Sequence, residues 1–231
     1  MEHDSTGFPE TLLDFPSVLV SDFDGTMTEH DFYLLAIERL IPPGTPNFWE
    51  EYRAGTISHF EALRRYFAAI RESEPAVQQV VNSMKLDPRL REGIDRLRRA
   101  GWGVVVTSAG CDWYIRRLLR SADVEIPVFA NPGTYVEREG LVMQRPTTSP
   151  FHSENLGVDK TAVVRKLISL RKNVAYAGDG FPDADPARLV PDSLRFARGD
   201  LATVLDAEKL AYRPFAVWFE IAAFLSDEAR S

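Results

Sequence analysis

Three short apolar runs, each ending in a polar turn that contains glycine, most constrain how this chain can fold. They cover residues 18–20, 102–107 and 173–177, and the turns at their ends contain DFDGT, TSAG and GDGFPDAD. Between them lie segments with apolar residues at three- and four-residue spacing, which predicts helices. Strands that alternate with helices form a parallel sheet with helices on both faces. We therefore expect an α/β fold, a three-layer doubly wound parallel sheet.

The spacing of the elements predicts an insertion after the first strand. Residues 30–87 are mostly helical and too long for a simple crossover, so we interpret them as a helical cap on a core domain made of residues 1–29 and 88–231. Strands are expected at 16–20, 102–107, 128–130, 173–177 and 194–197, and a small hairpin at 135–142. Helices are expected at 88–100, 111–121, 160–170 and 183–189. A helical tail carries Trp218 and Phe219, which we place in the core or at a dimer contact.

Composition excludes several classes of protein. The 231 residues include 45% hydrophobic and 26% charged residues, with a formal net charge of -7. Such an acidic balance disfavours a nucleic-acid binder that relies on a basic surface. No apolar run approaches the roughly 20 residues of a membrane span. The single cysteine, Cys111, allows no intramolecular disulfide and favours a cytoplasmic protein. We expect it to be a small buried residue rather than a nucleophile.

The strand ends predict a metal site. The carboxyl ends of parallel strands meet at one edge of the sheet, where ligands bind. Four carboxylates follow these ends, and they belong to Asp22, Asp24, Asp179 and Asp183. Asp22 and Asp24 are two positions apart, so both side chains can reach the same cleft. Because only a cation can stabilise such a cluster, and because Mg²⁺ prefers oxygen ligands, we expect a magnesium site.

A second set of residues at the strand ends predicts phosphate binding. The run formed by Ser108, Ala109 and Gly110 is expected to end a strand where a helix begins, with a hydroxyl and exposed amides suited to phosphate. Lys160 opens another expected helix and would add positive charge. Taken alone, DFDGT and GDGFPDAD could be turns or caps, Ser108 a turn residue and Lys160 a solvated lysine. Their occurrence together, on alternating strands, favours one common site.

These motifs together resemble the haloacid dehalogenase superfamily, and the match covers nearly the whole chain. The resemblance implies that Asp22 attacks phosphorus to form an aspartyl-phosphate, and that Asp24 protonates the leaving alcohol and then activates water. Asp24 also distinguishes the phosphatases from the dehalogenase branch, which lacks this second aspartate. The same resemblance implies that Asp22, Asp179 and the backbone carbonyl of Asp24 hold Mg²⁺ and that Asp183 supports the site. Ser108 and Lys160 would bind the transferring phosphoryl group.

The position of the cap resembles the phosphoserine phosphatase group. Within that group, the stretches DFDGTMT, SAGCDWYI and FARGDL are similar to the 2-hydroxy-3-keto-5-methylthiopentenyl-1-phosphate phosphatases of methionine salvage. Phosphoserine phosphatases carry a glutamate nine residues after the nucleophile and a cap arginine that holds the substrate carboxylate. Asp31 and Phe67 stand at the corresponding positions in this chain, with Arg64 and Arg65 nearby. We therefore expect Asp31 and Phe67 to contact a substrate without a carboxylate.

The expected function is Mg²⁺-dependent hydrolysis of a small phosphorylated metabolite, without nucleic-acid or membrane partners. Three alternatives stay open. The first is a phosphoserine phosphatase-like or other small-metabolite phosphatase, and the second is a phosphotransferase with an alcohol as acceptor. The third is a non-catalytic protein that binds a phosphorylated metabolite, against which the presence of both Asp22 and Asp24 counts. His30 and His59 are interpreted as surface or cap-packing residues.

Overall fold

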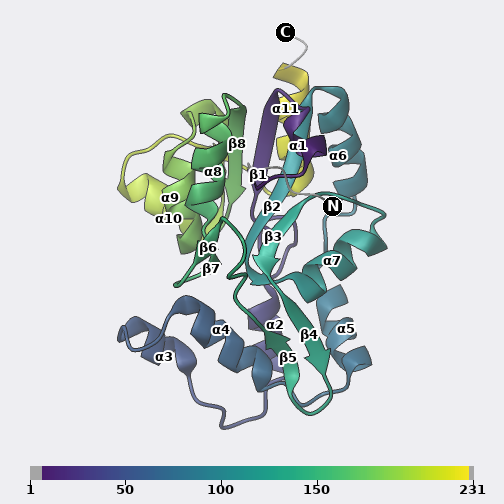
Figure 1. Cartoon of the computed structure of the whole chain (residues 1–231), viewed down its shortest axis with the longest axis vertical. Coiled ribbons are helices and arrows are strands. Elements are labelled where there is room, and N and C mark those ends of the chain that lie inside the picture. Colours follow the sequence, from purple (N-terminus) through teal and green to yellow (C-terminus); the bar gives the residue numbers. More distant parts are fainter. Residues whose placement is uncertain (1–6, 229–231) are drawn as a thin grey trace.

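A six-stranded parallel sheet forms the centre of the protein (Figure 1). The computed structural model describes residues 7–228. The order of strands across the sheet is β10-β9-β8-β1-β2-β3. These strands are β1 (Ser17–Ser21), β2 (Trp102–Cys111), β3 (Val128–Asn131), β8 (Asn173–Gly178), β9 (Arg195–Ala197) and β10 (Arg213–Pro214). Because β1 pairs with both β2 and β8, the turns after these strands lie next to one another.

Alternate residues of β1 face two different helical layers, which confirms the expected three-layer α/β fold. Leu19 belongs to the apolar cluster that contains Ile94 and Trp218, whereas Val18 and Val20 belong to the cluster that contains Val163. The first layer holds α6 (Leu90–Arg99), α7 (Asp112–Ser121) and α11 (Trp218–Glu228). The second holds α1 (Glu10–Leu13), α8 (Lys160–Ser169), α9 (Ala184–Arg188) and α10 (Gly199–Ala207).

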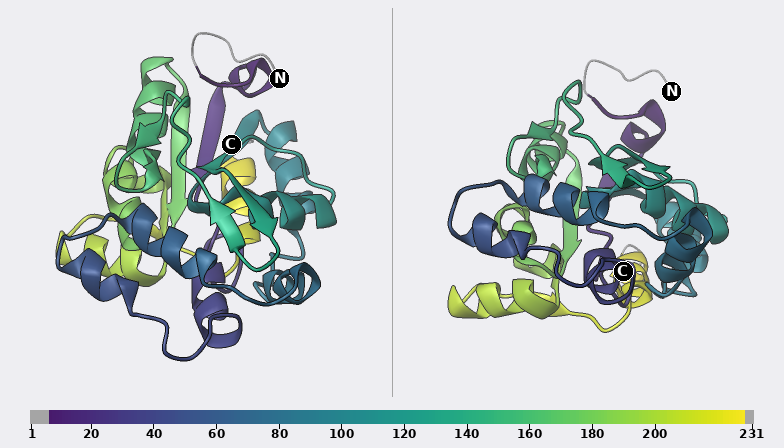
Figure 2. Two further views of the ribbon diagram at one scale, coloured as in Figure 1. Left: turned by 60° about the horizontal axis from the view of Figure 1, so that its bottom comes forward. Right: turned by 90° about the horizontal axis from the view of Figure 1, so that it is seen from below.

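Four of the helices between β1 and β2 lie at the carboxyl edge of the sheet (Figures 1 and 2). They are α2 (Phe32–Arg39), α3 (Phe48–Arg53), α4 (His59–Ala68) and α5 (Glu74–Asn82). The hairpin of β4 (Gly133–Val136) and β5 (Gly140–Met143) packs against α4. The Tyr135 hydroxyl also donates to the carbonyl of Glu72, at 2.8 Å. The hairpin is therefore joined to the inserted helices, although it follows β3 in the chain.

The structure differs from the sequence expectation at the end of β2. The strand was expected to end at residue 107, but it continues to Cys111, which pairs with Asn131 of β3 after a shift in register. Residues 108–110 therefore belong to the sheet, and α7 begins only at Asp112. Cys111 is fully buried, as expected, and burial raises the pKa of its thiol. Burial of this residue against β3 explains why the strand extends.

Several short elements had no sequence signal. The missed elements are α1, α10, β10, the hairpin of β6 (His152–Ser153) and β7 (Gly157–Val158), and the 3₁₀ turns η1 (Phe181–Asp183) and η2 (Asp192–Leu194). Strands of two residues are too short to show an alternating pattern. Trp218 lies in the core, where its indole nitrogen donates to the hydroxyl of Ser21 at 3.1 Å. Within residues 7–228, the helices are all too short or too polar to cross a bilayer.

Candidate active site

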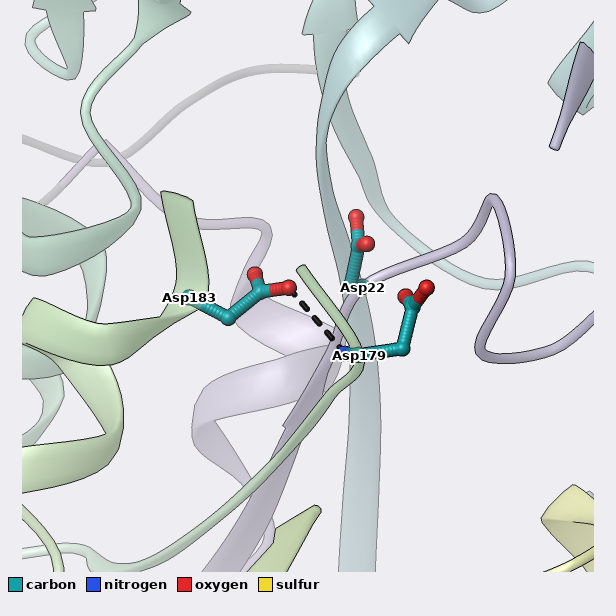
Figure 3. A group of neighbouring side chains, drawn as sticks. All are labelled: Asp22, Asp179 and Asp183. Carbon is teal, nitrogen blue, oxygen red and sulfur yellow. Dashed lines mark hydrogen bonds between the residues drawn. The ribbon is translucent and has the colours of Figure 1, made fainter. Parts of the chain in front are cut away.

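Three aspartates converge at the carboxyl edge of the sheet (Figure 3). Asp22 follows β1, Asp179 follows β8, and Asp183 ends the turn η1. One carboxylate oxygen from each residue lies within 4.8 Å of the others. The central position of β1, between β2 and β8, brings Asp22 beside residues that are more than 150 positions away in the chain. The geometry thus gathers three of the four aspartates that the sequence singled out.

Charge in this cluster is only partly balanced. The Lys160 ammonium lies 2.8 Å from Asp22 Oδ1 and 2.6 Å from Asp183 Oδ1, and the lysine is 3% exposed. Burial, followed by repulsion from Asp183, nevertheless raises the pKa of Asp22 well above its usual range. The same two causes raise the pKa of Asp179 to about 6. One buried cation among three carboxylates leaves an excess of negative charge that a divalent cation would stabilise, and oxygen donors suit Mg²⁺.

Asp183 has a different environment from the other two aspartates. Its Oδ1 accepts hydrogen bonds from Lys160 and from the Tyr176 hydroxyl, each at 2.6 Å. Its Oδ2 accepts from the backbone nitrogens of Asp179 at 3.2 Å and Gly180 at 2.9 Å, and Figure 3 shows the first of these. Four donors occupy the acceptor sites of one carboxylate. This arrangement favours the interpretation that Asp183 holds the loop after β8 in place over the interpretation that it ligates a metal directly.

The carboxylate of Asp24 is held apart from the cluster. Its Oδ1 accepts from the backbone nitrogen of Phe32 at 3.2 Å, and its Oδ2 accepts from the hydroxyls of Tyr114 at 2.9 Å and Ser108 at 3.3 Å. Burial raises the pKa of Asp24, and the hydrogen bond from Tyr114 opposes that rise. Asp22 and Asp24 therefore occupy distinct environments, which allows them distinct chemical roles.

The predicted phosphate-binding residues lie at the same edge of the sheet, but two of them are not in the expected turn. Ser108 is buried, and its hydroxyl accepts from the backbone nitrogen of Gly110 at 2.9 Å. Ala109 and Gly110 do not form the expected exposed turn before the helix, because they are buried in β2 and α7 begins at Asp112. Their amides therefore belong to the strand and not to the first turn of α7. Lys160 begins α8 as expected, and the side chain of Asp159 caps that helix by accepting from the nitrogen of Ala162.

Contacts that no local pattern could predict fix the loop that follows Asp22. The Thr26 hydroxyl donates to Asp179 Oδ1 at 2.7 Å. Gly25 has a φ of +67°, and a Cβ there would lie 2.2 Å from Asp179 Oδ2, so only glycine fits. The guanidinium of Arg198 donates to the carbonyls of Gly25 and Thr28. Arg198 lies in the FARGDL stretch, but its partners became visible only in the structure.

A cavity of about 310 Å³ opens beside Asp179, between α2 and the start of α10. Asp31 lines it and also caps α2, accepting from the nitrogen of Tyr33 at 2.7 Å. Burial, followed by the charge of Asp24, raises the pKa of Asp31. Phe67 is 1% exposed and packs against Phe32, with ring centroids 5.3 Å apart. Of the two expected substrate residues, the structure places Asp31 at this cavity and Phe67 in the aromatic core.

His30 and His59 lie in two different settings. His30 lines the cavity beside Asp31, and its imidazole lies 3.4 Å from Glu29. His59 packs against Trp49 and Tyr52 in the inserted helices, with ring centroids 5.1 and 5.6 Å away. Burial lowers the pKa of His59 to about 4, so it is neutral at physiological pH. His59 therefore packs among the aromatic residues of the inserted helices.

Comparison with known sequences gives consistent results. The profile of the haloacid dehalogenase-like hydrolases matches residues 19–188. A 2-hydroxy-3-keto-5-methylthiopentenyl-1-phosphate phosphatase from Brevibacillus brevis is 24% identical, over 90% of this chain and 94% of its own. The enzyme of that name from an Exiguobacterium species is 23% identical, over 90% of this chain and 96% of its own.

Solved structures share the fold. A phosphoserine phosphatase that carries an analogue of its phospho-aspartyl intermediate aligns with a TM-score of 0.62 and 17% identity, over 90% of this chain and 98% of its own. A hydrolase from Salmonella enterica serovar Typhi aligns with a TM-score of 0.67 and 16% identity, over 95% of this chain and 74% of its own. At these identities the likeness supports the architecture alone.

Proposed function

Because this chain belongs to the haloacid dehalogenase-like hydrolase family and is a phosphatase, we propose that it hydrolyses a small phosphorylated metabolite through an aspartyl-phosphate on Asp22. The observation that carries this proposal is the contrast between the two aspartates after β1. Asp22 faces Lys160 and the other carboxylates, whereas Asp24 is bonded to three donors on α2, β2 and α7. One can act as nucleophile while the other transfers protons.

The proposed reaction has two steps. A carboxylate oxygen of Asp22 attacks phosphorus, the bond from phosphorus to the alkoxide oxygen breaks, and Asp24 donates a proton to that oxygen. Asp24 then accepts a proton from water as the water oxygen attacks phosphorus, which releases phosphate and restores the carboxylate of Asp22. Lys160, which already bonds Asp22, and Ser108 would hold the transferring phosphoryl group.

The residues present fit a bound Mg²⁺ ion. Asp22, Asp179 and the backbone carbonyl of Asp24 would hold it, and Asp183 would support the loop that carries Asp179. When bound, the ion would neutralise phosphoryl oxygens and offset the repulsion between the carboxylates. The raised pKa values of Asp22 and Asp179 support this assignment, because burial and the charge of Asp183 together outweigh the lowering effect of Lys160.

We further propose that residues 30–87 form a cap that covers the leaving group and excludes bulk water. Their helices lie at the carboxyl edge of the sheet, beside the carboxylates. A methionine-salvage substrate, 2-hydroxy-3-keto-5-methylthiopentenyl-1-phosphate, is supported by the names of the relatives and by the arginines of α4. Arg64 pairs with Glu61, and Arg65 pairs with Glu51 and Glu61, so neither guanidinium is left to hold a substrate carboxylate.

Hydrolysis of p-nitrophenyl phosphate with Mg²⁺ by the wild type and by Asp22→Asn tests the nucleophile. We expect the variant to be inactive and the wild type, quenched in acid, to carry one phosphoryl group by mass spectrometry. Asp185→Asn is the matched control, because Asp185 is exposed and paired only with Arg188 on its own helix. Equal activity of Asp22→Asn and the wild type would reject the assignment of Asp22.

A panel of phosphorylated metabolites tests the substrate. We expect the methionine-salvage ester to give the highest kcat/KM, and a strong preference for phosphoserine would overturn that choice. Measuring phosphate and alcohol in the same reaction distinguishes hydrolysis from transfer. Equal amounts identify water as the acceptor, whereas a deficit of phosphate in the presence of a second alcohol would identify a phosphotransferase.

A further inference from the structure

The hydroxyl of Tyr114 is buried directly against the carboxylate of Asp24. Tyr114 lies on α7, is 1% exposed, and donates to Asp24 Oδ2 at 2.9 Å. Its ring packs on Phe32 with the centroids 4.5 Å apart and the planes tilted by 37°, and Phe67 packs edge-on at 6.3 Å. A ring held on two sides by aromatic neighbours keeps its hydroxyl in one place. The donor to Asp24 is therefore fixed by packing as well as by the hydrogen bond.

The hydrogen bonds around Asp24 differ between its two oxygens. Oδ2 accepts from both Tyr114 and Ser108, whereas Oδ1 accepts only from the backbone nitrogen of Phe32. Each carboxylate oxygen offers about two acceptor sites, so Oδ2 is filled and Oδ1 keeps one site free. Of the two side-chain donors, Tyr114 makes the shorter hydrogen bond, at 2.9 Å against 3.3 Å for Ser108. We propose that Tyr114 is a positioning residue that holds the carboxylate of Asp24 in the orientation for proton transfer, an inference that rests on the proposed role of Asp24.

Gly110 supports this arrangement independently. A Cβ at Gly110 would lie 1.9 Å from the Tyr114 hydroxyl oxygen and 2.9 Å from Asp24 Oδ2. The φ of Gly110 is not in the left-handed region, so the backbone itself does not require glycine at this position. The requirement is space, because the Tyr114 hydroxyl occupies the volume that any larger residue would fill. The sequence stretch SAGCDWY thus supplies both the donor and the gap through which it reaches Asp24.

Tyr114 also differs from Ser108 in what it can do during the reaction. Ser108 is expected to turn toward the phosphoryl group, and Tyr114 is then the side-chain donor that stays on Oδ2. As the bond from Asp22 to phosphorus forms and the bond to the leaving oxygen breaks, the proton carried by Asp24 moves to that oxygen. A poor leaving group such as an alkoxide needs this proton, whereas p-nitrophenolate leaves readily without it.

The dependence on the leaving group tests the proposal. We expect Tyr114→Phe to lower kcat/KM for glycerol phosphate about tenfold or more beyond its effect on p-nitrophenyl phosphate, as loss of a hydrogen bond to a charged group would. The ratio of kcat/KM values is the informative quantity, because it reports the steps up to departure of the alcohol. Tyr66→Phe is the matched control, since Tyr66 is also a buried residue but its hydroxyl donates to the side chain of Asn47, which caps α3. We expect it to leave the ratio unchanged.

Asp24→Asn separates the two possible failures. If kcat/KM for glycerol phosphate and for p-nitrophenyl phosphate falls by the same factor in this variant, the proposed role of Asp24 is wrong. If Asp24→Asn changes the ratio of the two kcat/KM values but folded Tyr114→Phe does not, the inference about Tyr114 is rejected. Gly110→Ala provides a second route, because its methyl group displaces the Tyr114 hydroxyl without removing it. It should change the ratio in the same direction, and an unchanged ratio in folded Gly110→Ala rejects the inference if Tyr114→Phe does not fold.

Discussion

Replacing Asp183 by asparagine is the sharpest test of how the carboxylate cluster is built. The side chain is fully buried and accepts from four donors, two on each oxygen. An amide has only one carbonyl oxygen, so its NH₂ group must face either Lys160 and Tyr176 or two backbone nitrogens. Whichever way it turns, two donors lose their acceptor, and Lys160 loses one of its two buried counter-charges.

The structure sets the size of the effect. Breaking one side of a buried ion pair costs about 3–5 kcal/mol. For a chain of this length, 1 kcal/mol shifts Tm by about 2–4 °C. We therefore expect Asp183→Asn to lower Tm by roughly 6–20 °C in the metal-free protein. The control Asp185→Asn removes an exposed pair with Arg188, which is worth about 0–1 kcal/mol.

Thermal unfolding and phosphatase activity, each measured across a magnesium titration, distinguish the two roles of Asp183. If Asp183 holds the loop after β8, the loss of Tm is present without Mg²⁺, and excess Mg²⁺ does not restore activity to the wild-type level. If Asp183 is instead a direct ligand, the stability of the metal-free protein changes by less than about 1 kcal/mol and high Mg²⁺ restores activity. The second pattern would refute the role of Asp183 as the residue that holds this loop.

Three further outcomes are expected. In the metal-free protein, Asp179 should contribute more stability as the pH falls from about 7 to about 5, because Asp179, with a pKa of about 6 when folded against 3.8 ordinarily, binds its proton more tightly in the folded state. His59, whose pKa is lowered to about 4, acts in the opposite direction over this range, so the check is the difference in Tm between the wild type and Asp179→Asn, which should rise as the pH falls and should no longer do so in saturating Mg²⁺. Arg198→Lys should destabilise the protein by about 1.5–3 kcal/mol, measured by urea unfolding, because a lysine cannot replace a guanidinium that donates to three backbone carbonyls. Asp31→Asn should raise kcat/KM for phosphoserine relative to phosphoethanolamine, since it removes a negative charge from the cavity beside the metal site.

The extended end of β2 and the hairpin on α4 show where sequence reasoning reached its limit. The apolar run at 102–107 predicted the strand. The last four residues of β2, at 108–111, include glycine and alanine and carry no strand pattern of their own. They are in the sheet because Cys111 pairs with Asn131. The turn residues Arg138, Glu139 and Gly140 predicted the hairpin, yet only the packing of β5 on α4 joined it to the inserted helices. In both places the deciding partner is distant in the chain.

The sequence alone determined the layered α/β architecture and the aspartates of the site. Parallel strands end at one edge, so polar turns that follow neighbouring strands must meet there, and a local pattern is enough to find Asp22 and Asp179. The tertiary structure alone decided which donors surround each carboxylate. Tyr114 lies 90 positions from Asp24, and Arg198 lies 173 positions from Gly25. Such contacts depend on how helices pack on the sheet, and packing between distant segments leaves no periodic signal in the chain.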